Sequence, residues 1–86
     1  MIKIVSKGQE DGVLVFEIEF DFQDKIHHLT IKKTPEEMLS YGSKEEFLDY
    51  VKKVVKEKRT ELLLKATDEL APLNEDIESS ETTEAS

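Results

Sequence analysis

The chain contains no cysteine and no tryptophan, and it has only three glycines and two prolines. The missing cysteine excludes disulfides, thiolate metal sites and a cysteine nucleophile. No apolar run approaches the roughly 20 residues that a membrane-spanning helix needs. The first residues, Met-Ile-Lys-Ile-Val, are too short and too soon charged for a signal peptide. We therefore expect a small protein of the cytoplasm with no membrane partner.

Motifs that carry chemistry are also missing. The patterns GxSxG, GxxxxGK[ST], GxGxxG and HExxH do not occur, and neither does an EF-hand loop. The two histidines, His27 and His28, are adjacent, so on a strand they point to opposite faces. Zinc needs three or four convergent ligands. The sequence thus predicts no enzyme activity, no cofactor, no metal and no small-molecule substrate.

The acidity of the chain is concentrated near its C-terminus. The formal net charge is −8, yet residues 1–74 contain fifteen acidic and twelve basic residues, and residues 75–86 contain five acidic residues and no basic one. The segment 73–86 is rich in Ser, Thr and Glu and nearly free of apolar residues, a composition typical of disorder. We predict one domain over 1–72, followed by a disordered acidic tail over 73–86.

The most regular pattern lies in residues 13–22, which alternate between apolar and acidic side chains. The apolar residues share one parity and the acidic residues share the other: Leu14, Phe16, Ile18, Phe20 and Phe22 against Glu17, Glu19 and Asp21. Successive side chains of a strand point to opposite faces. This strand therefore predicts a sheet with one apolar, covered face and one acidic, solvated face.

A second hairpin is predicted, closed either by Gln23 and Asp24 or by the four residues from Phe22 to Lys25, and it leads into a strand over about residues 25–33. One register pairs apolar with apolar and polar with polar residues across the two strands: Phe16 with Ile31, Ile18 with Leu29, Glu17 with Thr30, and Glu19 with His28. Ile26 is the exception, since this register places it opposite Asp21. The agreement makes the strand 13–22 central in the sheet.

The first strand is predicted from a shorter apolar pattern than the other two strands. Ile2 and Ile4 share a parity, and we expect them to lie opposite Phe16 and Leu14, respectively. Residues 6–12 contain two glycines among polar residues and are predicted to form a turn. These three strands would form an antiparallel β-meander.

Two helix starts follow the sheet. Thr34-Pro35-Glu36-Glu37 and Ser43-Lys44-Glu45-Glu46 both have the capping-box pattern, and the first also has proline at the first helical position. The first helix is short, because Gly42 follows. The second is predicted from Lys44 to about Glu69, roughly 39 Å, and so can overhang a strand of about 33 Å. The fold class is α+β, with the long helix packed on one sheet face.

Apolar residues of the long helix form two stripes. The first can cover the sheet and comprises Phe47, Val51, Val54, Val55 and Leu62. Leu63 lies about 100° from Leu62 around the helix, and it starts a second stripe with Ala66 and Leu70. This second stripe is either a partner surface or is covered by the first helix or by Leu73. We predict the partner interface at Leu62, Leu63, Ala66 and Leu70.

Two charged groups have a plain and a functional interpretation. Glu17, Glu19 and Asp21 form an acidic sheet face, which is a solvated surface unless a cleft shifts their pKa values apart. Lys52, Lys56 and Arg59 share a side of the helix and form a basic patch. A solvated helix face is the first interpretation of that patch, a protein-facing surface the second and nucleic acid the last, because no aromatic residues are interleaved.

By exclusion, the sequence predicts a non-catalytic protein–protein interaction or assembly protein that forms homo-oligomers through its C-terminal helix. The alternative is a small acidic inhibitor that mimics nucleic acid and occupies a basic cleft. Its carboxylates would repeat at roughly 6.8 Å along the β-strand. This distance is close to the spacing of successive phosphates in an extended nucleic-acid strand. The small size, the missing cysteines and the acidic tail resemble the accessory proteins of phages and other mobile elements, although no motif carries that resemblance.

Overall fold

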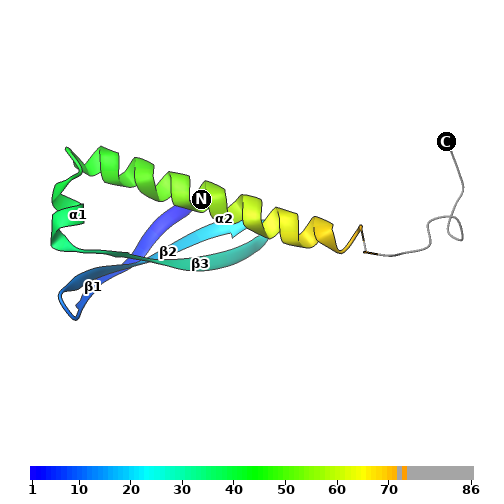
Figure 1. The fold of residues 1–86 in the computed structure, drawn as a ribbon, viewed down its shortest axis with the longest axis horizontal. Coiled ribbons are helices and arrows are strands. Elements are labelled where there is room, and N and C mark those ends of the chain that lie inside the picture. Colours follow the sequence, from blue (N-terminus) through cyan, green and yellow to red (C-terminus); the bar gives the residue numbers. More distant parts are fainter. Residues whose placement is uncertain (72, 74–86) are drawn as a thin grey trace, which may run out of the picture.

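The computed structural model describes residues 1–71 and 73, and within them three strands and two helices follow one another. They are β1 (Ile2–Glu10), β2 (Val13–Phe22), β3 (Lys25–Lys33), α1 (Pro35–Leu39) and α2 (Lys44–Asp68). The strands form one antiparallel sheet in the order β1-β2-β3, and α2 runs along one side of it (Figure 1). The predicted α+β class and the β-meander are confirmed. The predicted tail lies outside the described residues, except for Leu73.

The pairing of β2 with β3 follows the predicted register. The structure pairs Phe16 with Ile31, Ile18 with Leu29, Glu17 with Thr30, and Glu19 with His28. Gln23 and Asp24 close the hairpin with φ values of 51° and 63°. Two successive residues with positive φ are the mark of a type I′ turn, whose twist matches that of the flanking strands. Ile26 is also opposite Asp21 as predicted, and it is exposed.

The predicted pairing of β1 is wrong by four residues. Ile2 lies opposite Phe20 rather than Phe16, and Ile4 lies opposite Ile18 rather than Leu14. A register irregularity between Ile4 and Ser6 leaves Val5 as an extra residue in the strand. Such a bulge bends the strand and increases its twist. The error follows directly from the turn that was predicted to precede β2.

That turn is also shorter than predicted. Only Asp11 and Gly12 turn the chain, with φ values of 53° and 77°, whereas residues 6–10 continue β1. Asp-Gly is a preferred pair for a two-residue type I′ hairpin, because both positions need positive φ. The tight turn extends β1 by several residues and thereby shifts its register against β2.

The core is a single layer between the sheet and α2. Its buried residues are Phe16, Ile18, Phe20, Ile31, Phe47, Val51 and Val55. Val54 and Leu62 are half-buried at its margin. The predicted helix stripe therefore does cover the apolar face of the sheet. No residue of β1 is fully buried, so β1 is an exposed edge.

Side-chain caps fix where the helices begin. Thr34 accepts a hydrogen bond from the Glu37 amide at 3.1 Å, and its own amide donates to the Glu37 carboxylate at 2.8 Å, which completes the predicted capping box. At α2, Ser43 accepts from the Glu46 amide at 3.2 Å, but the Glu46 carboxylate accepts from the amide of Gly42 instead. A Cβ at position 42 would lie 2.6 Å from that carboxylate, so glycine suits this tight connection.

Candidate interaction surfaces

The last turns of α2 and the turn that follows its C-cap, Glu69, present an apolar stripe to solvent. Leu63 is 46% exposed and Leu70 is 82% exposed, and Ala66 between them is exposed as well. We call these three residues the leucine ridge. Leu62 is half-buried and packs against the core, so the ridge contains the exposed members of the predicted interface. Leu73 is 89% exposed and does not cover the ridge, which removes one of the two coverings that the sequence allowed.

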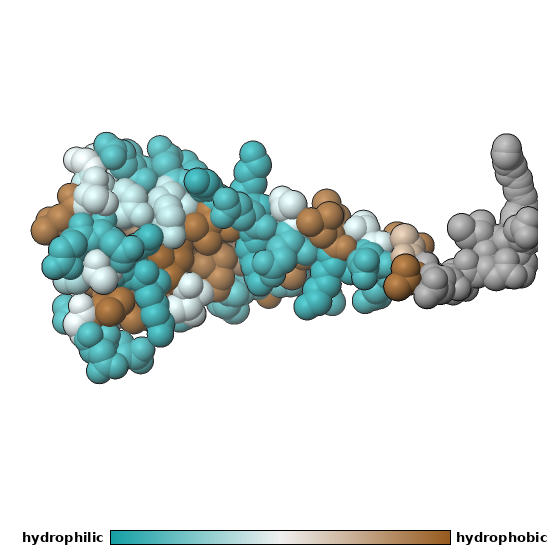
Figure 2. All heavy atoms as spheres, in the orientation of Figure 1, coloured by the Kyte–Doolittle hydropathy of each residue, from teal (hydrophilic) through white to brown (hydrophobic). Residues whose placement is uncertain are grey.

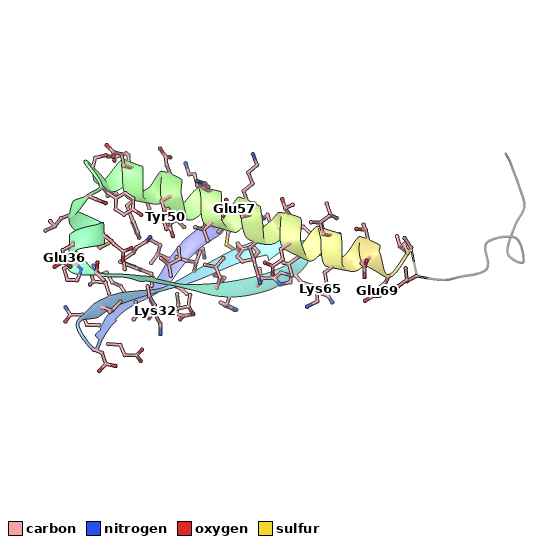
Figure 3. All side chains as sticks on the ribbon, in the orientation of Figure 1. Lys32, Glu36, Tyr50, Glu57, Lys65 and Glu69 are labelled. Carbon is pink, nitrogen blue, oxygen red and sulfur yellow. The ribbon has the colours of Figure 1, made fainter. Side chains whose placement is uncertain are left out.

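The position of the ridge follows from the length of α2. The helix continues past the ends of β2 and β3 (Figure 1), and apolar residues are visible on this extension, separate from those between the helix and the sheet (Figure 2). Lys65 and Glu69 also lie there (Figure 3). α1 joins the opposite end of α2 and cannot cover the ridge. The predicted overhang is therefore present.

Two carboxylates of the acidic sheet face have hydrogen-bond partners on the neighbouring strand β3. Thr30 donates to the Glu17 carboxylate at 2.7 Å, and His28 Nε2 lies 3.2 Å from a Glu19 carboxylate oxygen. Both pairs are the direct cross-strand neighbours that the register predicted. Cross-strand polar pairs of this kind stabilise a sheet modestly. Glu17 and Glu19 thus have satisfied polar groups on the sheet face opposite α2, whereas the Asp21 carboxylate is reached by Arg59 of α2.

Arg59, predicted as part of the basic patch, hydrogen-bonds to Asp21 of β2 instead of remaining free on the helix surface. Its Nε and Nη2 donate to the Asp21 carbonyl oxygen at 3.1 and 2.9 Å, and Nη2 also donates to the Asp21 carboxylate at 2.9 Å. The guanidinium lies 5.7 Å from the centroid of the Phe20 ring. Lys52 and Lys56 remain exposed on the same side of α2. Sequence reasoning missed the Arg59 contact, which ties the helix to the end of β2.

Asp21 provides a test of this contact by pH. The N-terminal amine of Met1, which donates to the Asp21 carboxylate at 2.7 Å, is the main cause that lowers the pKa of Asp21 below its usual 3.8, and Arg59 adds to it. A carboxylate with a lowered folded-state pKa stabilises the fold above the unfolded value and loses this effect as pH falls through the folded value. We expect Asp21→Asn to lower the denaturation midpoint at about pH 7.

The same difference should be smaller at an acidic pH below 3.8, because wild-type Asp21 becomes protonated as well when the pH falls toward its lowered folded-state pKa. Denaturant unfolding of both proteins at the two pH values measures it. Asp24→Asn is the matched control, because Asp24 is exposed in the hairpin turn and asparagine tolerates its positive φ. A midpoint difference for Asp21→Asn that is equal at both pH values would contradict this electrostatic account.

An apolar groove opens at the other end of α2, between its first turns and the β1–β2 hairpin. It has a volume of about 490 Å³ and is lined by Ile4, Lys7, Leu14, Phe16, Met38, Tyr41, Ser43, Lys44, Phe47 and Leu48. No acidic residue lines it, and its two charged residues are lysines. The sequence did not predict this groove, because its β1 wall depends on the register of β1. The hint in the sequence was a set of apolar residues around the start of the long helix: Met38 and Tyr41 before it, and Leu48 at the edge of its first stripe.

The histidines and carboxylates do not form a metal centre in the described part of the chain. His28 pairs with Glu19 on the uncovered face, while His27 stacks on Phe20 with ring centroids 5.5 Å apart. The predicted separation of the two histidines on opposite faces is confirmed. Within residues 1–71 and 73, no three His, Asp or Glu side chains come together as metal ligands would.

Neither described helix combines the length and the apolar character that crossing a membrane requires. Compared with known proteins, the chain matches no family model, no curated protein and no solved structure. The leucine ridge and the groove are therefore the surfaces from which a function has to be inferred.

Proposed function

We propose that this protein is a non-catalytic assembly protein that associates with copies of itself through the leucine ridge. The exposure of Leu63, on a helix that extends beyond its own sheet, and of Leu70, just after that helix ends, carries this proposal. A contiguous exposed apolar patch on a small protein commonly marks a site of interaction with another molecule. A cytoplasmic location and an accessory role in a phage or mobile element stay predictions that accompany it.

The expected affinity follows from the size of the ridge. Fully burying one leucine side chain stabilises by about 1.5–3 kcal/mol, and Leu63 is already about half buried. Two ridges that meet would therefore contribute roughly 4–9 kcal/mol. Association costs about 4–15 kcal/mol in lost translational and rotational freedom. At best the two terms leave about −5 kcal/mol, which places ridge-only association in the submillimolar range.

Sedimentation equilibrium over that concentration range tests the proposal. The wild type should show a mass that rises with concentration, and Leu63→Glu/Leu70→Glu should remain monomeric, because two carboxylates would be desolvated at the contact. Leu64→Glu is the matched control: Leu64 is 65% exposed on the same helix turn but points about 100° away from Leu63. It should associate like the wild type. A wild type that stays monomeric throughout would contradict the proposal.

The nucleic-acid mimic receives less support. A mimic presents free carboxylates to a basic cleft, whereas Glu17 and Glu19 are half-buried and bonded to Thr30 and His28. Lys32 lies on the same sheet face and pairs with Glu10 at 3.4 Å, which dilutes the negative charge. Glu17→Lys/Glu19→Lys should therefore leave self-association unchanged. Salt-sensitive binding of the wild type to a basic nucleic-acid-binding protein, lost in that variant, would favour the mimic.

A further inference from the structure

We infer that the leucine ridge of one copy docks in the apolar groove of the next copy, so that the chains associate head to tail. The inference rests on the proposed function and names the surface that receives the ridge. The groove is an uncovered apolar hollow, in whose walls Ile4 is exposed and Leu14, Met38 and Leu48 are half-buried. An amphipathic helix with apolar residues at i, i+3 and i+7 is a common occupant of such a groove. Leu63, Ala66 and Leu70 have this spacing.

The ridge cannot reach the groove of its own chain. Lys44, Phe47 and Leu48 of the groove and Leu63 and Ala66 of the ridge belong to one continuous helix, Lys44–Asp68, and Leu70 follows directly after its C-cap, Glu69. At 1.5 Å per residue, Leu63 lies about 22 Å from Leu48 along the helix axis. A helix without a break cannot fold back over that distance. The ridge that fills the groove must therefore come from a second copy.

Charge favours the same pairing. The groove is lined by Lys7 and Lys44 and by no acidic residue. The end of α2 carries Asp68 and Glu69 beside a single base, Lys65, and the C-terminus of a helix is the negative end of its dipole. Docking the ridge thus brings a negative helix end to a positive groove. Contacts between complementary charges of this kind set orientation as well as affinity.

The basic side of α2 argues against a closed, two-fold version of this contact. Leu48, Lys52 and Lys56 follow at intervals of four residues on one side of the helix, and Leu63 continues that side. If two antiparallel helices exchanged ridges reciprocally, they would meet near residue 56, and Lys56 of one copy would face Lys56 of the other. A head-to-tail contact separates these lysines. Heterologous contacts of this kind build rings or filaments rather than dimers.

Mixing two defective variants tests the inference. Leu63→Glu/Leu70→Glu removes the ridge, and Leu48→Glu blocks the groove at a half-buried position, with circular dichroism as the check on folding. We expect each variant alone to be monomeric, with association weakened about thirtyfold or more. An equimolar mixture should form a one-to-one dimer that grows no further, because it contains one intact ridge and one intact groove. The wild type should exceed the mass of a dimer at high concentration.

A second groove variant guards against misfolding. Lys7→Glu/Lys44→Glu changes only exposed side chains and should lower the association constant by roughly two- to tenfold at low salt. A Leu48→Glu protein that associates like the wild type would overturn the inference and leave the proposed function standing. A monomeric wild type would overturn both. Association that is lost in Leu48→Glu but kept in the ridge variant would assign the groove to another occupant, against the inference, as would a wild type that stops at the dimer.

Discussion

Replacing Phe20 with alanine is expected to lower the free energy of unfolding by about 3–5 kcal/mol. Phe20 is fully buried, its ring stacks on His27, and the Arg59 guanidinium lies over it. The truncation removes apolar burial, leaves a cavity and takes away both ring contacts. Small domains have a total stability of roughly 5–15 kcal/mol, and one with a single core layer belongs near the lower end. Much of the variant should therefore be unfolded at room temperature.

Denaturant titration followed by circular dichroism measures this effect. Ile26→Ala is the control, because Ile26 is an apolar residue of the neighbouring strand that is 53% exposed on the uncovered face. Its expected cost is about 0.5 kcal/mol or less. Equal denaturation midpoints for Phe20→Ala and Ile26→Ala would mean that α2 does not cover the face of the sheet that carries Phe20.

The covered face was predictable because β2 has a strict parity. Every even residue from Leu14 to Phe22 is apolar, and a one-residue slip would bury three acids. The same argument specified which face of β3 is covered, and the two-residue turn at Gln23 and Asp24 selected the register that places Ile31 and Leu29 opposite Phe16 and Ile18. Patterns of this kind determine structure locally. Little else in the fold had to be known.

β1 was less predictable because its pattern is weak. Beyond Ile4 and Val5 the strand consists of Ser, Lys, Gly, Gln and Glu, residues without an apolar face. A strand with no buried side chain in that half does not specify its own register, and the turn decides it instead. Asp11 and Gly12 were the stronger signal, since two positive-φ positions close a hairpin without further residues. The prediction of a turn over residues 6–12 did not separate this two-residue signal from the polar residues before it.

The interaction surfaces divide in the same way. The exposure of Leu63 followed from the angle between neighbouring helix residues, so the ridge was predictable. The Arg59–Asp21 contact joins residues 38 positions apart and depends on how far along the sheet α2 lies. The groove depends in addition on the register of β1. No local sequence pattern specifies the position of α2 along the sheet or the register of β1. The Arg59–Asp21 contact and the groove could therefore be found only in the folded structure.

Val55→Asp should unfold the domain outright. Val55 is fully buried in the centre of the layer between α2 and the sheet, and the described residues place no buried polar or charged side chain there to pair with a carboxylate. Burying an unpaired charge costs several kcal/mol, even after the protein relaxes around it. Added to the lost valine contacts, this exceeds the stability that one core layer provides. The helical signal in circular dichroism should fall sharply.

Thr60→Asp is the matched control for that experiment. It introduces the same charge into the same helix, at an exposed position, so it carries the same cost in helix propensity without burial. It should remain folded and should associate like the wild type, because residue 60 lies outside both the ridge and the groove. Val55→Asp should lose the groove together with the fold, because Phe47 and Leu48 line the groove only while α2 is packed on the sheet. If Val55→Asp were as stable as Thr60→Asp, α2 would not be held to the sheet by this face, and the groove would not exist as a preformed receptor.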